Sequence, residues 1–355
     1  MPRPFSSVVI DTYNHERFIE QAIVSVLEQD IAASEREILV VDDGSTDRTP
    51  EIVRKFEPRV RLIRKANGGQ ATAFNTGIPE CRGEIVAFLD GDDWWALGKL
   101  RTVSDVLATD AAVGLVGHGI TEDYGGEGQH TELLREVSRF RITSEEGARA
   151  FRLRKNFLGT SRMTYRTEIL RKIGKVPEAL TIQADEYLFT MAGLFEDVLI
   201  LREPLTFYRL HESNAFQITK HAVEAIRRKQ KVLEALAISL SEQFALHGLP
   251  DNIARIIVGW VQNEADQQRL LADGGYPWET VRVELEDYRV MHENASPAHW
   301  TFKCATLLPA CVLPPRLYYA LKRRFAKNDL YLKTREKWLP YLQPTHVDRY
   351  RTPRV

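Results

Sequence analysis

The chain has 355 residues, of which 44% are hydrophobic, and its 48 Lys and Arg against 49 Asp and Glu give a formal net charge of -1. This composition excludes intrinsic disorder as the default state, because the chain carries enough apolar residues to bury a sizeable core. It also gives no support to nucleic-acid binding through an excess of positive charge.

The cysteine content and the apolar runs bear on the compartment. Cys81, Cys304 and Cys311 show neither C-x-x-C spacing nor the density of a disulfide scaffold, which predicts reduced thiols. The N-terminus lacks the apolar stretch and small-residue cleavage site of a secretory signal. Charges interrupt every apolar run before the roughly 18 residues that a membrane-spanning helix needs. We therefore expect a cytoplasmic protein, with attachment to a membrane surface left open.

The first third of the chain alternates strand and helix patterns. Apolar runs predict strands, and apolar residues at a 3.6-residue spacing predict the helices between them. The expected strands are Val8–Ile10, Ile38–Val41, Val60–Ile63 and Ile85–Leu89, and the expected helices run through Ile19–Leu27, after Asp47 and through Gln70–Ile78. This order is typical of an α/β fold with a mostly parallel sheet flanked by helices. Ligands of such sheets bind at the carboxyl ends of the strands.

The rest of the chain is first mixed and then helical. Short strands are expected near Met163 and Val198, and a mainly helical C-terminal region begins near His221. We place a boundary near residue 218, with domains at 1–218 and 219–355. The helical region is a candidate acceptor site or homodimer interface, and its composition does not decide between them.

The tail from Pro314 is basic and aromatic, with Arg316, Lys322 and Arg324 among its charged residues. A solvated helix packed on the main domain is the favoured interpretation. The alternative is a peripheral contact of this tail with an anionic membrane at its cytoplasmic face.

Acidic residues follow two of the predicted strands. Asp42–Asp47 and Asp90–Asp93 each lie where a strand gives way to a turn. Three carboxylates within four residues at the end of a buried strand repel one another unless a cation is present. Hard oxygen ligands suit Mg²⁺ or Mn²⁺, with phosphate oxygens completing the shell. His211 is a candidate to close this shell, and Asp185, at the start of a predicted helix, is a candidate general base.

These positions, in this order, resemble the family 2 glycosyltransferases with the GT-A fold, a Rossmann-like architecture. The resemblance covers about residues 6–214 and rests on four motifs: Val8–Asn14, Val40–Asp47, Asn67–Gly69 with Asn75–Gly77, and Gly83–Asp93. It implies transfer of a sugar from a nucleotide-diphosphate donor, most commonly in the assembly of surface polysaccharide or glycoconjugates. The acceptor it implies is a glycan, a lipid-linked molecule or a small molecule.

The resemblance also implies roles for single residues. The nucleotide would be held by Thr12, Tyr13, Asn14, Asp43, Asn67, Gly69, Asp90 and Gly91, with Asp43 accepting the N3–H of a uracil or thymine. Asp90-Gly91-Asp92 matches the family's DXD motif. Asp92 and His211 match its metal ligands, for Mn²⁺ or Mg²⁺. Asp185 matches the base that activates the acceptor in an inverting displacement, and Gly159-Thr160-Ser161 matches a loop beside the donor sugar.

This chain departs from the family pattern at two places. Asp11 stands where the family usually has Pro. It adds a carboxylate near the pocket for the nucleobase, which leaves the identity of the nucleobase open, with a UDP-sugar favoured. Ala184 stands where the family often has an acid, so Glu186 is an alternative to Asp185 as base. The Q-x-x-R-W motif of processive synthases is absent, which favours a single-transfer enzyme.

Two other functions are compatible with a sheet of this kind. A sugar nucleotidyltransferase would carry a Gly- and Arg-rich triphosphate loop after the first strand, and Ile10–His15 does not provide one. A non-catalytic sugar-nucleotide-binding protein would share the pocket, but the intact candidates for base and metal ligands argue against it. Trp94 and Trp95, next to the acidic motif, are predicted to be core residues rather than a platform for a sugar ring.

Overall fold

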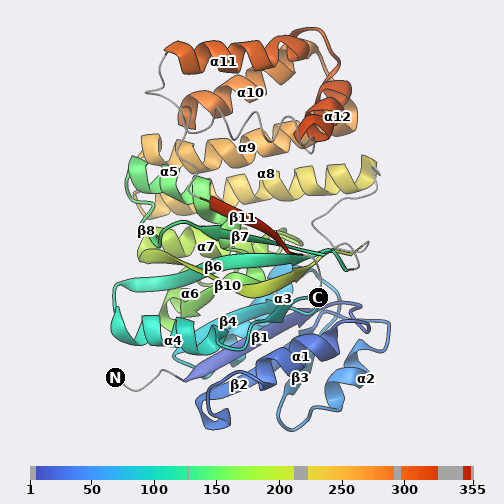
Figure 1. Cartoon of the computed structure of the whole chain (residues 1–355), viewed down its shortest axis with the longest axis vertical. Coiled ribbons are helices and arrows are strands. Elements are labelled where there is room, and N and C mark those ends of the chain that lie inside the picture. Colours follow the sequence, from blue (N-terminus) through green and yellow to red (C-terminus); the bar gives the residue numbers. More distant parts are fainter. Residues whose placement is uncertain (1–4, 126–127, 212–222, 292–296, 327–346, 353–355) are drawn as a thin grey trace. The chain divides into compact units, whose positions relative to one another are not determined.

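The computed structural model describes residues 5–125, 128–211, 223–291, 297–326 and 347–352 (Figure 1). The chain forms two compact units, which are residues 1–214 with 347–355 and residues 215–346. The boundary predicted near residue 218 falls within 212–222, outside the described residues.

The first unit is built on a parallel sheet. Its four N-terminal strands are β1 (Ser6–Thr12), β2 (Arg36–Asp42), β3 (Arg61–Arg64) and β4 (Ile85–Asp90), and they run parallel in the order β3-β2-β1-β4. The helices between them are α1 (Ile19–Leu27), α2 (Thr49–Arg54) and α3 (Gln70–Gly77). The predicted alternation of strands and helices is confirmed over this segment.

Later strands extend the sheet with both parallel and antiparallel pairs. They are β5 (Trp94–Trp95), β6 (Val113–Asp123), β7 (Gln129–Leu134), β8 (Ser138–Phe140), β9 (Thr164–Arg166) and β10 (Asp197–Arg209). Strand β10 runs parallel to β6, whereas β9 is antiparallel to both β4 and β6. The whole sheet is therefore mixed, within the expected α/β class.

The helices of this second part of the unit lie between those strands. They are α4 (Lys99–Thr109), α5 (Glu145–Arg154), α6 (Thr167–Ile173) and α7 (Ala184–Phe195), with short 3₁₀ turns at Ala33–Glu35, Ile78–Glu80, Lys155–Phe157 and Thr160–Arg162.

Apolar side chains of the central strands point alternately to the two faces of the sheet, and both faces are buried. Val8 and Ile10 pack with Ile19 and Ile23 of α1 on one face. On the other face Val9 lies against Gly77 of α3, where a Cβ atom on the glycine would approach the valine at 3.1 Å. Because successive side chains of a strand point to opposite faces, two buried faces require the continuous apolar runs seen in β1, β2 and β4.

The second unit is helical, as predicted for this region. Its elements are α8 (Val223–Leu246), α9 (Asp251–Asp273), α10 (Pro277–Met291), α11 (Pro297–Leu307), a 3₁₀ turn η6 (Leu308–Cys311) and α12 (Pro315–Ala326). Among the described residues, no helix is long and apolar enough to cross a membrane.

The region predicted to be mainly helical also contains a strand near its end. Residues Val347–Thr352 form strand β11, which pairs antiparallel with β7 and belongs to the first unit. The segment Val-Asp-Arg-Tyr-Arg-Thr alternates apolar or β-branched residues with charged ones in part, but it is short and polar, so its pairing depends on a free edge at β7 that the local sequence does not show.

Candidate active site

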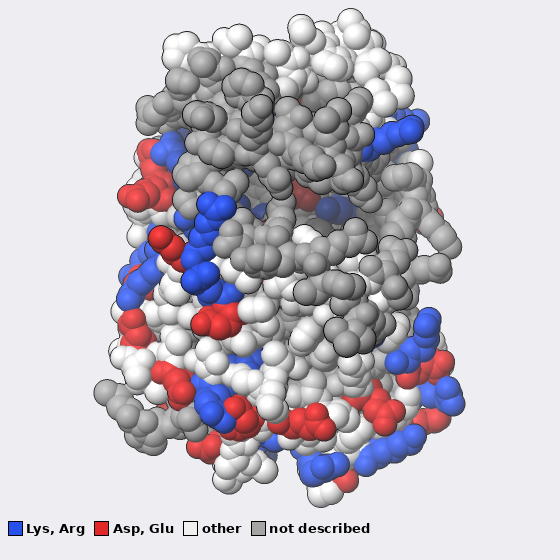
Figure 2. Space-filling model, viewed as in Figure 1, with Lys and Arg blue, Asp and Glu red and all other residues white. Residues whose placement is uncertain are grey.

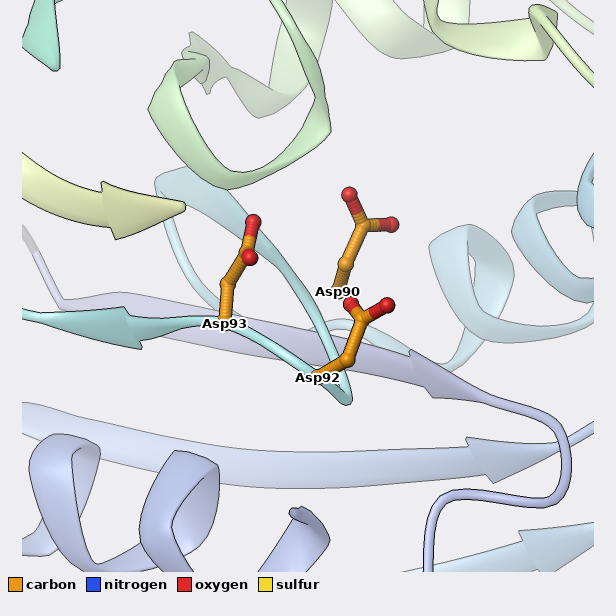
Figure 3. Close-up of side chains that lie close together, drawn as sticks. All are labelled: Asp90, Asp92 and Asp93. Carbon is orange, nitrogen blue, oxygen red and sulfur yellow. The ribbon is translucent and has the colours of Figure 1, made fainter. Parts of the chain in front are cut away.

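The acidic motif lies at the carboxyl end of β4, beside the carboxyl end of β1. Asp90 is the last residue of β4 and pairs in register with Asp11 of β1. Asp90, Asp92 and Asp93 each offer one carboxylate oxygen, and these three atoms lie within 4.8 Å of one another. Figure 3 shows the three side chains projecting to the same side of the turn that follows β4. Burial and the neighbouring charges of Asp11 and Asp93 raise the pKa of Asp90 well above its usual range.

Two histidines from distant parts of the chain approach Asp92. His211, after β10, has its Nε2 3.0 Å from Oδ2 of Asp92, and His15, after β1, has its Nε2 3.7 Å from the same oxygen. Burial opposes the charged form of Asp92, but the hydrogen bond with His211 and the nearness of His15 outweigh it and lower the pKa of Asp92. The structure thus brings together the predicted pair Asp92 and His211, and adds His15.

Asp93 has a different role from its neighbours. Its Oδ2 accepts a hydrogen bond of 2.6 Å from the hydroxyl of Ser161, and its Oδ1 accepts one of 2.9 Å from the backbone N–H of Arg209. The Arg209 guanidinium donates to the carbonyl oxygen of Asp92 at 2.9 Å and lies over the ring of Trp94. Asp93 therefore joins the acidic turn to the 3₁₀ turn around Ser161 and to the end of β10, which places His211 beside Asp92.

The two candidate bases lie in different surroundings. Glu186 is buried, and its carboxylate binds Nζ of Lys155 at 3.0 Å and the side-chain amide of Gln183 at 3.2 Å. Asp185 is half-buried, and it accepts backbone N–H groups of Glu186 at 2.9 Å and Thr160 at 3.2 Å. Desolvation raises the pKa of Asp185 despite these hydrogen bonds. The 3₁₀ turn Thr160–Arg162 links Asp185 to the acidic motif, because Thr160 donates to Asp185 and the next residue, Ser161, donates to Asp93.

Asp11 adds a carboxylate between these groups. Burial, followed by the charge of Asp92, raises the pKa of Asp11 to about 8, and Asp185 contributes in the same direction. Its Oδ1 is buried and has no hydrogen-bond partner among the described residues. Several carboxylates with one orphaned oxygen form a donor set that fits a hard divalent cation, which would offset their mutual repulsion. The residues present therefore fit the predicted Mg²⁺ or Mn²⁺ site.

Asp43 is held by the loop between β3 and α3. Its Oδ1 accepts Nζ of Lys65 and the N–H of Gly68 at 3.0 Å, and its Oδ2 accepts the N–H of Gly69 at 2.7 Å. The amide of Asn67 donates to the carbonyl oxygen of Asp43 at 3.0 Å. A carboxylate has about four acceptor positions. Three are used here, which leaves one on Oδ2 for a ligand N–H.

The loop after β1 lies against the turn after β2. The N–H of Asn14 donates to the hydroxyl of Ser45 at 2.8 Å, and the Asn14 side chain accepts the N–H of Thr46 at 2.8 Å. These bonds tie the loop to the turn after β2. Tyr13 is 44% exposed between them, and the hydroxyl of Thr12 lies 3.2 Å from Nδ1 of His15.

Gly91 allows the turn after β4 to pass close to this loop. A Cβ atom at position 91 would meet the Thr12 hydroxyl at 2.5 Å and Nδ1 of His15 at 2.9 Å. The first strand's loop and the acidic turn therefore pack together only with a glycine between them. The predicted nucleotide residues thus lie around one edge of the sheet, near the predicted metal residues.

Sequence reasoning missed four residues of this site: His15, Lys65, Arg162 and Arg209. Arg162 ends the 3₁₀ turn whose Thr160 donates to Asp185 and whose Ser161 donates to Asp93. The position of His15 directly after Asn14 was the one available sequence signal, because the other three contacts depend on pairing between distant segments. Trp95 is buried as predicted, and Trp94 stacks on Phe207 with ring centroids 5.1 Å apart.

Comparisons with known proteins identify the family of the first unit. Residues 7–174 match the family described as "Glycosyl transferase family 2". An uncharacterized glycosyltransferase of Nostoc sp. is 34% identical over 216 residues, which are 59% of this chain and 65% of that protein. The chain carries a glycosyltransferase family 2 domain.

The fold of this protein has counterparts among solved structures. Its structure matches that of Staphylococcus aureus TarS residues 1–349 with a TM-score of 0.53 and 17% identity, over 90% of this chain and 91% of that one. The same TarS fragment in complex with UDP-GlcNAc gives a TM-score of 0.51 and 19% identity, over 81% and 90% of the two chains. These likenesses show the expected GT-A architecture.

In sequence, TarS is described as a poly(ribitol-phosphate) beta-N-acetylglucosaminyltransferase and is 37% identical over 92 residues, 25% of this chain and 16% of that protein. The chain thus spans less than two thirds of the length of either curated relative in these alignments.

Proposed function

We propose that this protein transfers a sugar from a UDP-sugar to an acceptor hydroxyl with inversion at the anomeric carbon. The observation that carries the proposal is the position of Asp185, which accepts the backbone N–H of Thr160 at 3.2 Å, next to the Ser161 that donates to Asp93, while Glu186 is engaged by Lys155 at 3.0 Å. A half-buried carboxylate beside the acidic motif is a group that an acceptor hydroxyl can reach.

The reaction forms one bond and breaks one. The acceptor oxygen attacks the anomeric carbon as the bond from that carbon to the diphosphate oxygen breaks, and the hydroxyl proton passes to Asp185. Burial raises the pKa of Asp185, which makes its carboxylate a stronger base than an exposed aspartate. The hydrogen bonds from Thr160 and Glu186 hold the carboxylate in place for this transfer.

Asp92, with His211 and His15 beside it, would hold Mn²⁺ or Mg²⁺ against the diphosphate. When bound, the cation supplies positive charge that stabilises the departing diphosphate. The orphaned Oδ1 of Asp11 and the crowding of Asp90 and Asp93 support this assignment, since the site without a cation carries uncompensated repulsion.

Two observations support a uridine nucleotide. Asp43 keeps one acceptor position on Oδ2, which suits the N3–H of uracil. The relative TarS is by name an N-acetylglucosaminyltransferase, and its fragment was solved with UDP-GlcNAc. The acceptor is a glycan, a lipid-linked molecule or a small molecule, in the assembly of a polysaccharide or glycoconjugate.

The test is thermal unfolding of the protein with UDP, dTDP, GDP and CDP, each with and without Mn²⁺. A ligand at 100 times its dissociation constant adds about 2.7 kcal/mol of stability. We expect a metal-dependent shift with UDP, and its loss in Asp92→Asn but not in Glu20→Gln, an exposed acid on α1. Release of UDP from a panel of UDP-sugars with acceptor then tests the activity. A shift without any turnover, for either donor hydrolysis or transfer, would favour the non-catalytic binding protein.

A further inference from the structure

Exposed apolar side chains gather in one part of the second unit. Trp278 is 62% exposed, Leu308 66% and Val312 74%, and Tyr276 and Leu317 are exposed as well. A folded protein gains nothing from leaving large apolar groups in water, and several of them together mark a surface that meets another apolar phase. No such role belongs to the active site, whose residues all lie in the first unit.

These residues surround one buried cluster. Leu270, Leu307, Ala310 and Tyr318 belong to the same small core, and Leu271 and Leu313 pack against it. Leu308, Val312 and Leu317 are each the direct chain neighbour of a residue in this set.

A hydrogen bond brings the remaining two residues to the same place. The guanidinium of Arg316, at the start of α12, donates to the carbonyl oxygen of Leu271 at 3.1 Å and also to that of Ala272. The start of α12 therefore lies against the end of α9. Tyr276 and Trp278 follow α9 within six residues of Ala272, and Trp278 lies on α10, whose Val283 belongs to the same buried cluster as Tyr318, the neighbour of Leu317. We call Tyr276, Trp278, Leu308, Val312 and Leu317 the apolar rim.

The segment that carries most of the apolar rim, residues 297–326, is strongly basic. Residues 297–326 contain Lys303, Arg316, Lys322, Arg323 and Arg324 and no Asp or Glu. Lys303 and Lys322 are both paired with the buried Glu284, whereas Arg316 and Arg324 are exposed. A rim of Trp, Tyr and aliphatic side chains next to exposed cations is complementary to an anionic lipid surface, where aromatic rings settle at the headgroup level and cations meet lipid phosphates.

A second copy of the chain fits this surface less well. In a two-fold dimer the same patch meets itself, which would bring two acid-free basic segments together. Like charges at an interface oppose association, whereas an anionic membrane attracts them.

We propose that the apolar rim and the basic segment 297–326 dock the protein on the surface of an anionic membrane. The docking is peripheral, since the described helices include none that could span a bilayer. This inference does not depend on the proposed sugar transfer.

The test is co-sedimentation of the full chain with vesicles of phosphatidylcholine alone and of phosphatidylcholine with phosphatidylglycerol. We expect binding to the anionic vesicles, weakened by high salt because screening removes the charge attraction. The variants Val312→Glu and Leu317→Glu should each lower the partition coefficient about tenfold or more, because each removes the burial of one aliphatic side chain. Ile238→Glu, at another exposed apolar position on α8, is the matched control and should bind like wild type.

Controls separate loss of docking from loss of fold. All three substituted side chains are exposed, so the unfolding temperature and the Mn²⁺-dependent UDP shift should match wild type. Equal binding to neutral and anionic vesicles, or unchanged binding in both rim variants, would overturn the proposal. So would absence of vesicle binding together with a dimer in light scattering that Val312→Glu converts to a monomer, which would assign the rim to a second copy of the chain.

Discussion

Asp185 and Glu186 are adjacent residues at the start of α7, and their partners separate their roles. Replacement of Asp185 by Asn removes the proton acceptor while keeping the shape of the side chain. We expect kcat to fall by about 10²- to 10⁴-fold, with UDP binding in the presence of Mn²⁺ retained. Steady-state kinetics and calorimetric titration with UDP check the two halves of this prediction. Near-normal turnover in Asp185→Asn would remove this residue from the role of base.

The pH dependence of the reaction follows from the same carboxylate. Asp185 accepts a proton only when it is ionised, and burial raises its pKa above the usual value of 3.8. The acidic limb of kcat/KM should therefore lie at a higher pH than an exposed aspartate would give. Glu186→Gln is the matched control. The acidic limb of its kcat/KM profile should lie at the same pH as that of wild type, because Glu186 is paired with Lys155 and does not take the proton.

His15 was not predicted from the sequence, and its distance of 3.7 Å from Oδ2 of Asp92 gives it a testable effect on the metal. Groups that orient a metal-binding carboxylate typically contribute 10- to 100-fold in metal affinity. We expect His15→Asn to weaken Mn²⁺ binding by about that factor, measured by electron paramagnetic resonance of free Mn²⁺. His130→Asn, whose ring lies 3.6 Å from Glu122 away from the acidic motif, is the control. Equal loss in both variants would contradict a local role for His15.

At the scale of elements, the loop between β3 and α3 holds Asp43. Gly69, the N-cap residue of α3, has φ of +85°, and a Cβ atom there would meet the backbone of Thr181 at 2.7 Å. Gly69→Ala should therefore displace the loop and withdraw the N–H group that Oδ2 of Asp43 accepts. We expect a marked loss of UDP affinity, measured by calorimetry, with metal binding to Asp92 preserved. Gly98→Ala is the control, because a Cβ at residue 98 meets nothing within 4 Å.

Some of these elements can be predicted from the sequence and others cannot. The strands β1, β2 and β4 are predictable because their apolar runs are long and each ends in a polar turn, and the acids of those turns fall at the sheet edge by the rule for parallel strands. The contacts of Lys65 with Asp43 and of Arg209 with Asp92 are not predictable, because each joins segments that meet only when the sheet has formed. Strand β11 is missed for the same reason: its partner β7 lies more than two hundred residues away.

At the scale of the molecule, the net charge is close to zero, but like charges gather in particular places. Acidic and basic side chains are interspersed among the described residues on the face seen in Figure 2. The acid-free segment 297–326 and the carboxylates gathered at the sheet edge depart from this mixing. Repulsion among those carboxylates acts on the stability of the first unit.

The burial of Asp11, together with repulsion from its acidic neighbours, makes stability depend on pH. Its pKa is raised to about 8 in the folded protein, from 3.8 when unfolded. Between those values the folded state binds one more proton than the unfolded state, so the free energy of unfolding falls as pH rises from about 4 to about 8. Asp11→Asn lacks this group, and its unfolding temperature should exceed that of wild type by a margin that grows from pH 5 to pH 8 in the presence of EDTA. Thermal scans of both proteins across this range measure the margin.

Saturating Mn²⁺ should shrink the same margin at pH 8, because a bound cation offsets the carboxylate charges that raise the pKa of Asp11. The cation then stabilises wild type more than Asp11→Asn, although both keep Asp92 and His211. A margin that is constant with pH would show that Asp11 ionises at its ordinary pKa in the folded protein, and therefore that it lies in water rather than among the buried acids. If the difference in unfolding temperature between Asp11→Asn and wild type grows with pH but does not change when Mn²⁺ is added, the bound cation lies too far from Asp11 to affect its pKa.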